Sequence, residues 1–378
     1  MPAPIPATHP SDAALAAAVS ARAARPALRP FGALRFVLAA LVMLHHYGID
    51  LSPEWIKAVV VPVGPGDMAV MVFFALSGFI ILEAASFFYA RRAWPFLANR
   101  TLRIVPGYFA ALIAAVLAFL LLWSAGVLRS VDGAALGPEV FSPRNILANA
   151  LAVIPLSGRF GPAIDYLYLW PVWSLRVELV FYFSIFAAIL LAARLGRVYE
   201  RAFGASLAAL AAAGLAATLW AVTSGADSSA RFAVYFVFGG AVFLAARGGR
   251  AALWAALLCL PVILAQMWNY NAAIHVALGR SHAGQVALLG SLLAAFVWLA
   301  VWSRRAPGRW DRYLGDLAYP LFLNHLTVAT ALRSLTQENT LPAMLAGMAL
   351  SVALAAIMER LVEPAIRPWR NRWRGAAL

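Results

Sequence analysis

The sequence predicts an all-α membrane protein, a polytopic bundle of about ten transmembrane helices. Hydrophobic residues make up 63% of the 378 residues and charged residues only 12%, whereas soluble domains contain about 45–50% and about 25%. The apolar residues gather in blocks of roughly 17 to 25, long enough to cross a hydrocarbon layer about 30 Å thick as helices. The sequence does not show the segments of about ten residues with alternating polarity that are typical of a membrane β-barrel.

Ten stretches are apolar and long enough to be transmembrane helices. They cover residues 33–50, 67–88, 104–126, 171–193, 205–222, 231–246, 251–267, 284–302, 314–334 and 341–361. In the longest connection, 127–170, the apolar stretch 146–155 is too short to cross, so we expect a re-entrant or interfacial segment. We expect residues 1–30 to form a disordered cytoplasmic tail, 31–366 the membrane domain and 367–378 a basic cytoplasmic tail.

The basic residues predict the orientation of the bundle. Cytoplasmic connections of membrane proteins carry an excess of Lys and Arg. With the N-terminus inside, twenty-one of the thirty basic residues lie on the cytoplasmic side and seven on the outer side. Both termini are therefore expected in the cytoplasm, and the net charge of +14 needs no nucleic-acid partner. The other two, Arg35 and Arg176, fall within or at the edge of stretches, where ionised groups are costly and usually functional.

Two polar residues share a face of the first stretch. Arg35 and His46 are eleven positions apart, so both point the same way while lying about 16.5 Å apart along the helix. Arg35 near the cytoplasmic end suits an anionic group, and His46 in the outer half could act as a base. The alternative is that Arg35 extends to cytoplasmic headgroups and His46 marks the interface.

The third stretch is preceded by an arginine pair. Arg100 and Arg103 are three positions apart and would share a helix face at the cytoplasmic side, where two guanidinium groups can clamp a phosphate or pyrophosphate. The competing interpretation is that the two arginines only set the orientation of the protein in the membrane, and their spacing alone favours it.

The fourth and ninth stretches carry further polar residues. Ser174 and Glu178 are four positions apart and should project on one face, about one turn into the membrane from the outer side. This is the depth inferred for His46, so Glu178 could orient a catalytic imidazole. Asn324 and His325 fall near the bilayer midplane, where polar groups rarely face lipid. Structural hydrogen bonding between helices is the alternative for both pairs.

Neither a metal site nor a bound cofactor is expected. The single cysteine, Cys259, excludes an intramolecular disulfide and a thiolate cluster, and the histidines form no metal-ligand pattern.

In combination, these residues and their neighbours resemble the acyltransferase-3 family of integral membrane O-acyltransferases. The resemblance covers residues 31 to 366 and rests on five blocks in order: Arg35 with His46, Phe73-Phe-Ala-Leu-Ser-Gly-Phe79, Arg100-Thr-Leu-Arg-Ile-Val-Pro106, Trp173-Ser-Leu-Arg-Val-Glu-Leu-Val-Phe-Tyr182 and Tyr319-Pro-Leu-Phe-Leu-Asn-His325. The chain departs from the family in having Glu178-Leu179 where a second acidic or amide residue is frequent, and Ala318-Tyr319-Pro320 where Ser-Tyr-Ser is frequent.

The resemblance implies a role for each matching position. Arg35 and His46 match the family's essential pair, Arg100 and Arg103 its proposed acyl-CoA contact, and Glu178 its acidic residue. We expect His46, Glu178 and Arg35 to be catalytic, with Arg35 also contacting acyl-CoA. Ser174, Asn324 and His325 are expected to bind the acceptor.

The resemblance also implies a function. We expect an O-acyltransferase of the bacterial inner membrane that transfers an acyl group, taken as acetyl, from cytoplasmic acyl-CoA to a hydroxyl of a cell-surface or exopolysaccharide sugar, which can be lipid-linked. Because only residues 362–378 follow the last stretch, the branch without a C-terminal esterase-like domain is expected. The alternatives are a macrolide or other small acceptor and, in a different class, a flippase or transporter for lipid-linked sugar, in which the intramembrane charges line a path.

Overall fold

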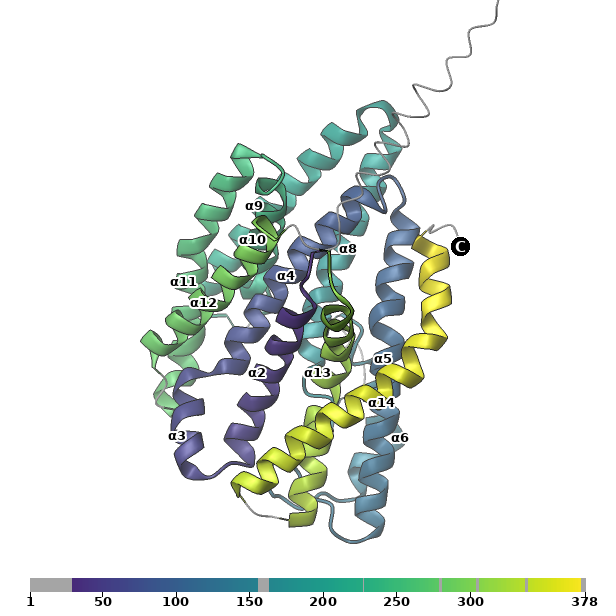
Figure 1. Ribbon diagram of the computed structural model, residues 1–378, viewed down its shortest axis with the longest axis vertical. Helices are drawn as coiled ribbons and strands as arrows, with labels where there is room; N and C mark the ends of the chain where they lie inside the picture. Colours follow the sequence, from purple (N-terminus) through teal and green to yellow (C-terminus); the bar gives the residue numbers. More distant parts are fainter. Residues whose placement is uncertain are drawn as a thin grey trace, which may run out of the picture.

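The structure is a computed structural model that describes residues 29–155, 163–226, 228–278, 281–303, 306–336 and 339–374. Helices dominate these residues (Figure 1). No strand forms within them, although an isolated bridge pairs Arg129 with Ala135. The predicted disordered tail lies outside the described residues except for its last two positions.

Twelve α-helices and three short 3₁₀ helices make up the described fold. They are α2 (Gly32–Asp50), α3 (Glu54–Val63), α4 (Pro65–Phe87), α5 (Ala93–Ser124), η1 (Pro138–Phe141), α6 (Pro143–Leu151), α8 (Val172–Arg194), η2 (Gly196–Val198), α9 (Tyr199–Ser224), η3 (Ser229–Phe232), α10 (Ala233–Ala245), α11 (Arg250–Leu278), α12 (His282–Val301), α13 (Arg309–Thr336) and α14 (Leu341–Arg374).

Each predicted stretch falls on a helix, namely α2, α4, α5 and α8 to α14. Eight helical segments of the described chain are long and apolar enough to cross a membrane. The two stretches that do not reach this standard are α10, which has 13 residues, and α13, which carries Asn324, His325 and several charges. The protein is therefore an all-α, multi-pass membrane protein.

The polar helix α13 lies inside the bundle. It packs along α2 and α14, and α2 in turn contacts α4. Asn324 and His325 have no exposed surface, so their polar groups are shielded from lipid by neighbouring helices. Helices α9 to α12 gather on one side of this centre, and α5 and α14 lie on the other (Figure 1).

Glycines allow the central helices to approach closely. A methyl group added at Gly239 of α10 would lie 1.7 Å from the Ala75 carbonyl oxygen of α4, and one at Gly78 would lie 2.2 Å from the Phe236 carbonyl oxygen. At the crossing of α2 and α13, a methyl group on Gly32 would lie 1.6 Å from the Asp311 carbonyl oxygen. Small residues at such crossings are typical of membrane helix packing.

The interfacial segment predicted at 146–155 contains the end of a short helix, α6. Its two buried asparagines bind the connection that follows. Asn145 Oδ1 accepts hydrogen bonds from the backbone of Asp165 and Tyr166, and Asn149 Oδ1 accepts one from Tyr168. Tyr108 of α5 donates to the Asn149 carbonyl oxygen at 2.5 Å. The segment is thus held against α5.

Helix α14 continues to Arg374, through most of the region predicted as a basic tail. The Arg370 guanidinium donates to both oxygens of Glu363 at 2.8 and 2.9 Å, and Asn99 of α5 donates to the Arg370 carbonyl oxygen at 2.8 Å. The Asn99 contact holds the extension of α14 against α5.

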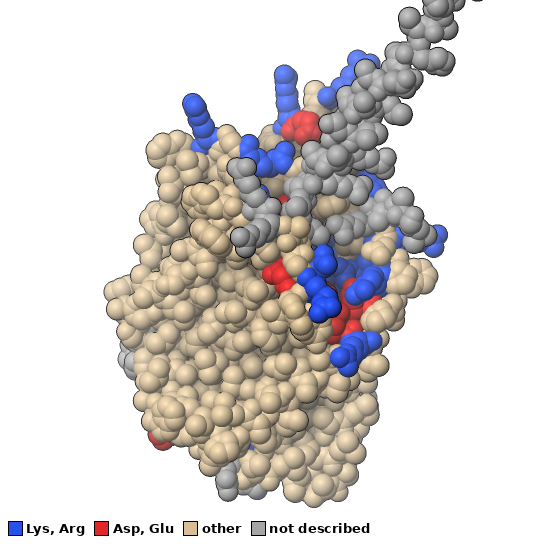
Figure 2. Space-filling view, in the orientation of Figure 1, with Lys and Arg blue, Asp and Glu red and all other residues tan. Residues whose placement is uncertain are grey.

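Arginines gather at one end of the molecule. Figure 2 shows Lys and Arg side chains toward one end of this face, with a broad region of uncharged residues beyond them. We call this end, which includes the starts of α2 and α5 and the end of α14, the basic end. A cavity described below opens there.

Candidate active site

Arg35 lies where three adjoining cavities meet. It lines each of them together with Arg103. The central chamber is enclosed by α4, α5, α8 and α13 and has an empty volume of about 770 Å³, counting its open side. The basic mouth, at the basic end, has about 1150 Å³, and a side chamber beside α14 has about 720 Å³. Arg35 therefore faces the interior rather than lipid headgroups.

Glu178 lies in the central chamber. Its carboxylate accepts hydrogen bonds from Ser77 of α4 at 3.1 Å and from Tyr182, one turn along α8, at 2.6 Å. Ser174 lines the same chamber, so the predicted shared face of Ser174 and Glu178 is confirmed. The charges around Arg35 include Glu178, Arg103 and Asp316. A carboxylate here offsets part of the positive charge of the arginines.

The expected pairing of Glu178 with His46 is wrong. No hydrogen bond joins these two side chains in the described structure. Glu178 lies in the chamber that Arg35 lines, whereas His46 is eleven positions along α2 from Arg35, about 16.5 Å away along the axis. The depth of Glu178 was inferred by counting from the outer end of its own stretch. Counting cannot reveal the tilt and offset between helices.

The two arginines of α5 face the same space, as their spacing predicts. Arg100 and Arg103 line both the central chamber and the basic mouth. Arg100 is only 6% exposed, and its guanidinium lies 5.9 Å from the ring centre of Phe96 and 6.0 Å from that of Tyr182. Its Nε is buried without a hydrogen-bond partner. This arrangement holds guanidinium groups toward a cavity. Arginines that only set the orientation of the protein in the membrane would not need to face one.

Arg176 is separate from this site. Its Nε donates to the Ala152 carbonyl oxygen, in the connection between α6 and α8. Arg176, one of the two charges expected within or at the edge of a stretch, thus binds the connection that precedes α8.

Histidines from two helices form a second polar group. The ring centres of His46 and His325 are 5.2 Å apart, and those of His45 and His46 are 5.4 Å apart. His325 Nδ1 lies 3.2 Å from the Leu321 carbonyl oxygen, and its Nε2 is buried without a partner. Tyr47 donates to the His325 carbonyl oxygen at 3.3 Å. We call His46 and His325 the histidine pair.

Asn324 points away from the histidine pair. Its amide nitrogen donates to the Pro320 carbonyl oxygen at 2.9 Å and contacts the Met358 sulfur of α14 at 2.8 Å. Asn324 therefore contacts α14, although it is adjacent to His325 in sequence. Binding of an acceptor by Asn324 stays a prediction.

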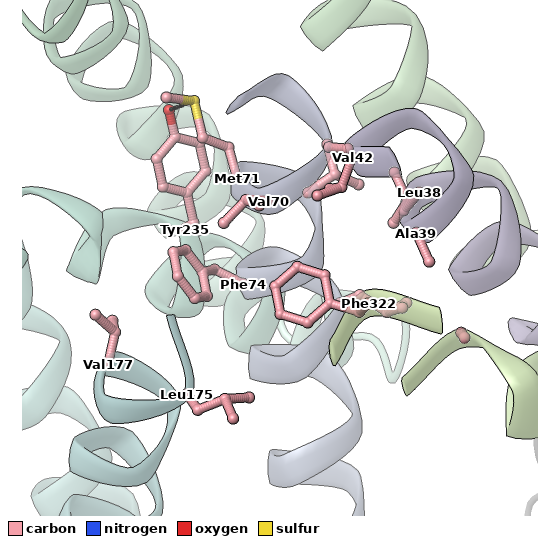
Figure 3. Packing of buried hydrophobic residues seen from close by; sticks show 14 of the residues in the cluster. Leu38, Ala39, Val42, Val70, Met71, Phe74, Leu175, Val177, Tyr235 and Phe322 are labelled. Carbon is pink, nitrogen blue, oxygen red and sulfur yellow. Dashed lines mark hydrogen bonds between the residues drawn. The ribbon is translucent and has the colours of Figure 1, made fainter. Parts of the chain in front are cut away.

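An aromatic side chain separates the central chamber from the histidine pair. Phe322 lines the chamber, and its ring centre is 6.0 Å from that of Phe73 and 6.4 Å from that of His325. Figure 3 shows Phe322 reaching from α13 into the space beside α4. Neither His46 nor His325 lines the chamber. Phe322 thus lies between the chamber and the histidine pair.

The comparison with known families identifies the chain. A family model described as an acyltransferase domain matches residues 31–360. The chain belongs to the acyltransferase-3 family. Neither the curated proteins nor the solved structures include a match to this chain.

As a member of the acyltransferase-3 family with these apolar helices, the protein is a membrane acyltransferase. The structure brings Arg35, Arg100, Arg103, Glu178 and Ser174 to one chamber and places His46 and His325 together beyond it. Within the described residues, no group of three or more His, Cys, Asp or Glu is placed to hold a metal ion.

Sequence reasoning missed several side chains of this acyltransferase site. Tyr182 had a usable signal, since it lies four positions after Glu178 and therefore on the same face. Ser77 belongs to one of the five blocks of the resemblance, but its hydroxyl was assigned no role there, and its neighbour Gly78 allows close packing. Asp316 and Phe322 had no signal, because their place in the site depends on how α13 packs against α2 and α4.

Removing the Tyr182 hydroxyl should slow acyl transfer. Tyr182→Phe deletes the 2.6 Å hydrogen bond to Glu178, and a hydrogen bond to a charged group is worth about 1.5–3 kcal/mol, so we expect a loss of at least about tenfold. Tyr235→Phe, which deletes a buried hydroxyl bonded to Gln266 outside the chamber, is the control. Initial rates with both variants check this, and full activity in Tyr182→Phe would contradict it.

Proposed function

We propose that this acyltransferase moves an acyl group from acyl-CoA to a hydroxyl of a cell-surface or exopolysaccharide sugar. The observation that carries the proposal is the arrangement of the arginines. They extend from the basic mouth into the central chamber, where Arg35 and Arg103 line every cavity of the site. Guanidinium groups match phosphate oxygens in geometry and charge, and acyl-CoA carries phosphates at one end and its thioester at the other.

In this proposal the donor enters from the basic end. Its phosphates bind at Arg100 and Arg103, Arg35 guides the pantetheine arm, and the thioester extends past Phe322 toward the histidine pair. Arg35 and His46 lie about 16.5 Å apart along α2, a distance that suits an extended pantetheine arm. The acyl group is taken as acetyl.

The histidine pair supplies the proton chemistry. His46 takes the proton from the sugar hydroxyl as its oxygen attacks the thioester carbonyl carbon, and the carbon–sulfur bond then breaks. The thiolate leaves and takes up a proton to give free CoA. His325, whose ring lies beside His46, is placed to orient the imidazole or the acceptor. In a second version, His46 itself attacks the thioester carbonyl carbon, the carbon–sulfur bond breaks and CoA leaves, and the sugar hydroxyl then takes the acyl group from the imidazole.

Glu178 has a different role here from the one expected. Its contacts with Ser77 and Tyr182 and its place near Arg35 support a role in holding the arginines of the chamber. Ser174 lies beside it. Glu178 thus acts on the donor side, away from the histidine pair.

The enzymatic proposal is tested by release of free CoA from acetyl-CoA by the purified protein in lipid vesicles, with a crude extract of polysaccharide precursors as acceptor. His46→Ala should lower the rate about 10²–10⁴-fold, as expected for loss of a general base, and Arg35→Ala should also lower it. Arg194→Ala, which removes an exposed arginine outside the three cavities, should leave it unchanged.

Full activity in His46→Ala would contradict both versions of the mechanism, the one with His46 as a base and the one with His46 as an acyl carrier. A wild-type protein that neither consumes nor binds acetyl-CoA would favour a transporter. Loss of acetyl groups from the surface polysaccharide of a deletion strain would support a sugar acceptor, and an unchanged polysaccharide would favour a small hydrophobic acceptor.

We further propose that the basic end faces the cytoplasm of a bacterial inner membrane. The excess of basic residues at this end supports it (Figure 2). Cys259 is fully buried, so cysteines introduced at exposed positions can be labelled against a low background. An impermeant thiol reagent added to intact spheroplasts should label Arg144→Cys and spare Arg250→Cys. The reverse pattern would overturn the orientation.

A further inference from the structure

Three buried arginine nitrogens at the basic mouth have no hydrogen-bond partner. They are the Nε atoms of Arg29, Arg100 and Arg370, which come from the segment before α2, from α5 and from α14. All three arginines line the mouth. Buried polar groups in folded proteins are nearly always paired, so these three arginines around one cavity lack part of the hydrogen bonding that a buried guanidinium normally finds within the protein.

The charge of the mouth selects an anion. Its walls carry six arginines, at positions 29, 35, 100, 103, 312 and 370, against three acidic residues, at positions 83, 311 and 316. One of the acidic side chains, Asp311, accepts a hydrogen bond from the Ala33 backbone at 2.9 Å. The excess of three positive charges favours a ligand with several negative charges.

The arginines of the mouth lie at two levels. Arg100 and Arg103 also line the central chamber, whereas Arg29 and Arg370 do not. A ligand that extends from the mouth into the chamber therefore meets two separate groups of guanidinium donors. Acyl-CoA has two separate anionic groups, a diphosphate next to the pantetheine arm and a 3′-phosphate on the ribose.

Arg370 is fixed at the mouth by its own contacts. Glu363 accepts from its Nη1 at 2.8 and 2.9 Å, and Asn99 binds its carbonyl oxygen. This leaves Nε without a partner. The residue lies ten positions beyond the last residue that the family model matches.

We propose that Arg370, together with Arg29, binds the 3′-phosphate of acyl-CoA, so that the extension of α14 completes the donor site. The inference rests on the proposed function and adds a specific phosphate contact to it. Arg100 and Arg103 then bind the diphosphate, which is nearer the chamber.

The test compares acetyl-CoA with acetyl-3′-dephospho-CoA as donors, for the full-length protein in phosphatidylcholine vesicles. The wild type should have a KM for acetyl-CoA at least about tenfold lower than for the dephospho donor, since charged hydrogen bonds to one phosphate are lost. Arg370→Ala should raise the KM for acetyl-CoA by a similar factor and leave the KM for the dephospho donor unchanged. Arg29→Ala should act in the same direction.

Arg367→Ala is the matched control. Arg367 lies one turn away on α14, also pairs with Glu363, at 3.6 Å, and is 58% exposed, but it does not line the mouth. Its loss should change neither KM. Because Arg367 remains beside Glu363 in Arg370→Ala, that variant does not leave the carboxylate without a cation.

The outcomes separate this inference from the proposed function. Equal effects of Arg370→Ala on both donors would mean a structural role and overturn the 3′-phosphate contact alone. No turnover of either donor by the wild type would overturn the proposed function and this inference with it. A lipid phosphate could present the same oxygens. If Arg370→Ala weakens the binding of phosphatidylglycerol but changes the KM of neither donor, Arg370 is a lipid contact and the inference fails.

Discussion

A guanidinium group within a membrane helix constrains the rest of this structure. Arg35 lies about one turn into α2, and an ionised group at such a position is stable only with water or counter-charges around it. The protein provides space for water and counter-charges. Three cavities meet at Arg35, and the carboxylates of Glu178 and Asp316 lie near it.

The surrounding contacts follow from this constraint. Glu178 is itself a charge inside the bundle, and Ser77 and Tyr182 satisfy it with hydrogen bonds from two helices. The crossing of α2 and α13 uses Gly32 and Gly315, whose lack of side chains lets α13 lie close to Arg35. Close helix packing and the buried charge therefore depend on each other, because the charge of Arg35 is stable only where the surrounding helices shield it from lipid.

The site divides its polar groups into two levels along α2. Arginines and carboxylates surround the chamber near the basic end. The histidine pair lies beyond Phe322 and outside the arginine-lined cavities. This separation suits a reaction with an anionic donor on one side and an acceptor on the other. It also keeps the guanidinium charges away from His46, where a neutral imidazole is needed to accept a proton.

The helices and most of the chamber could be predicted from the sequence, because both depend on local signals. Each of the ten apolar blocks falls on a helix, and spacing placed Ser174 with Glu178 and Arg100 with Arg103. The pairing of Glu178 with His46 was wrong because a position along one helix does not determine its level against another. Phe322, Asp316 and Arg370 enter the site through the packing of α13 and α14, and the sequence carries no signal for that packing.

The central claim is that the arginine-lined cavities bind the donor, and CoA binding without any acceptor tests it most directly. We would measure the melting temperature of the detergent-solubilised protein with increasing CoA. A ligand that binds only the folded state raises the free energy of unfolding by about 2.7 kcal/mol when its concentration is a hundred times its Kd. The wild type should therefore melt at a higher temperature with CoA. Arg103→Ala should lose this shift, and Arg201→Ala, at an exposed position outside the cavities, should keep it. An unchanged melting temperature in the wild type, or a full shift in Arg103→Ala, would contradict the account.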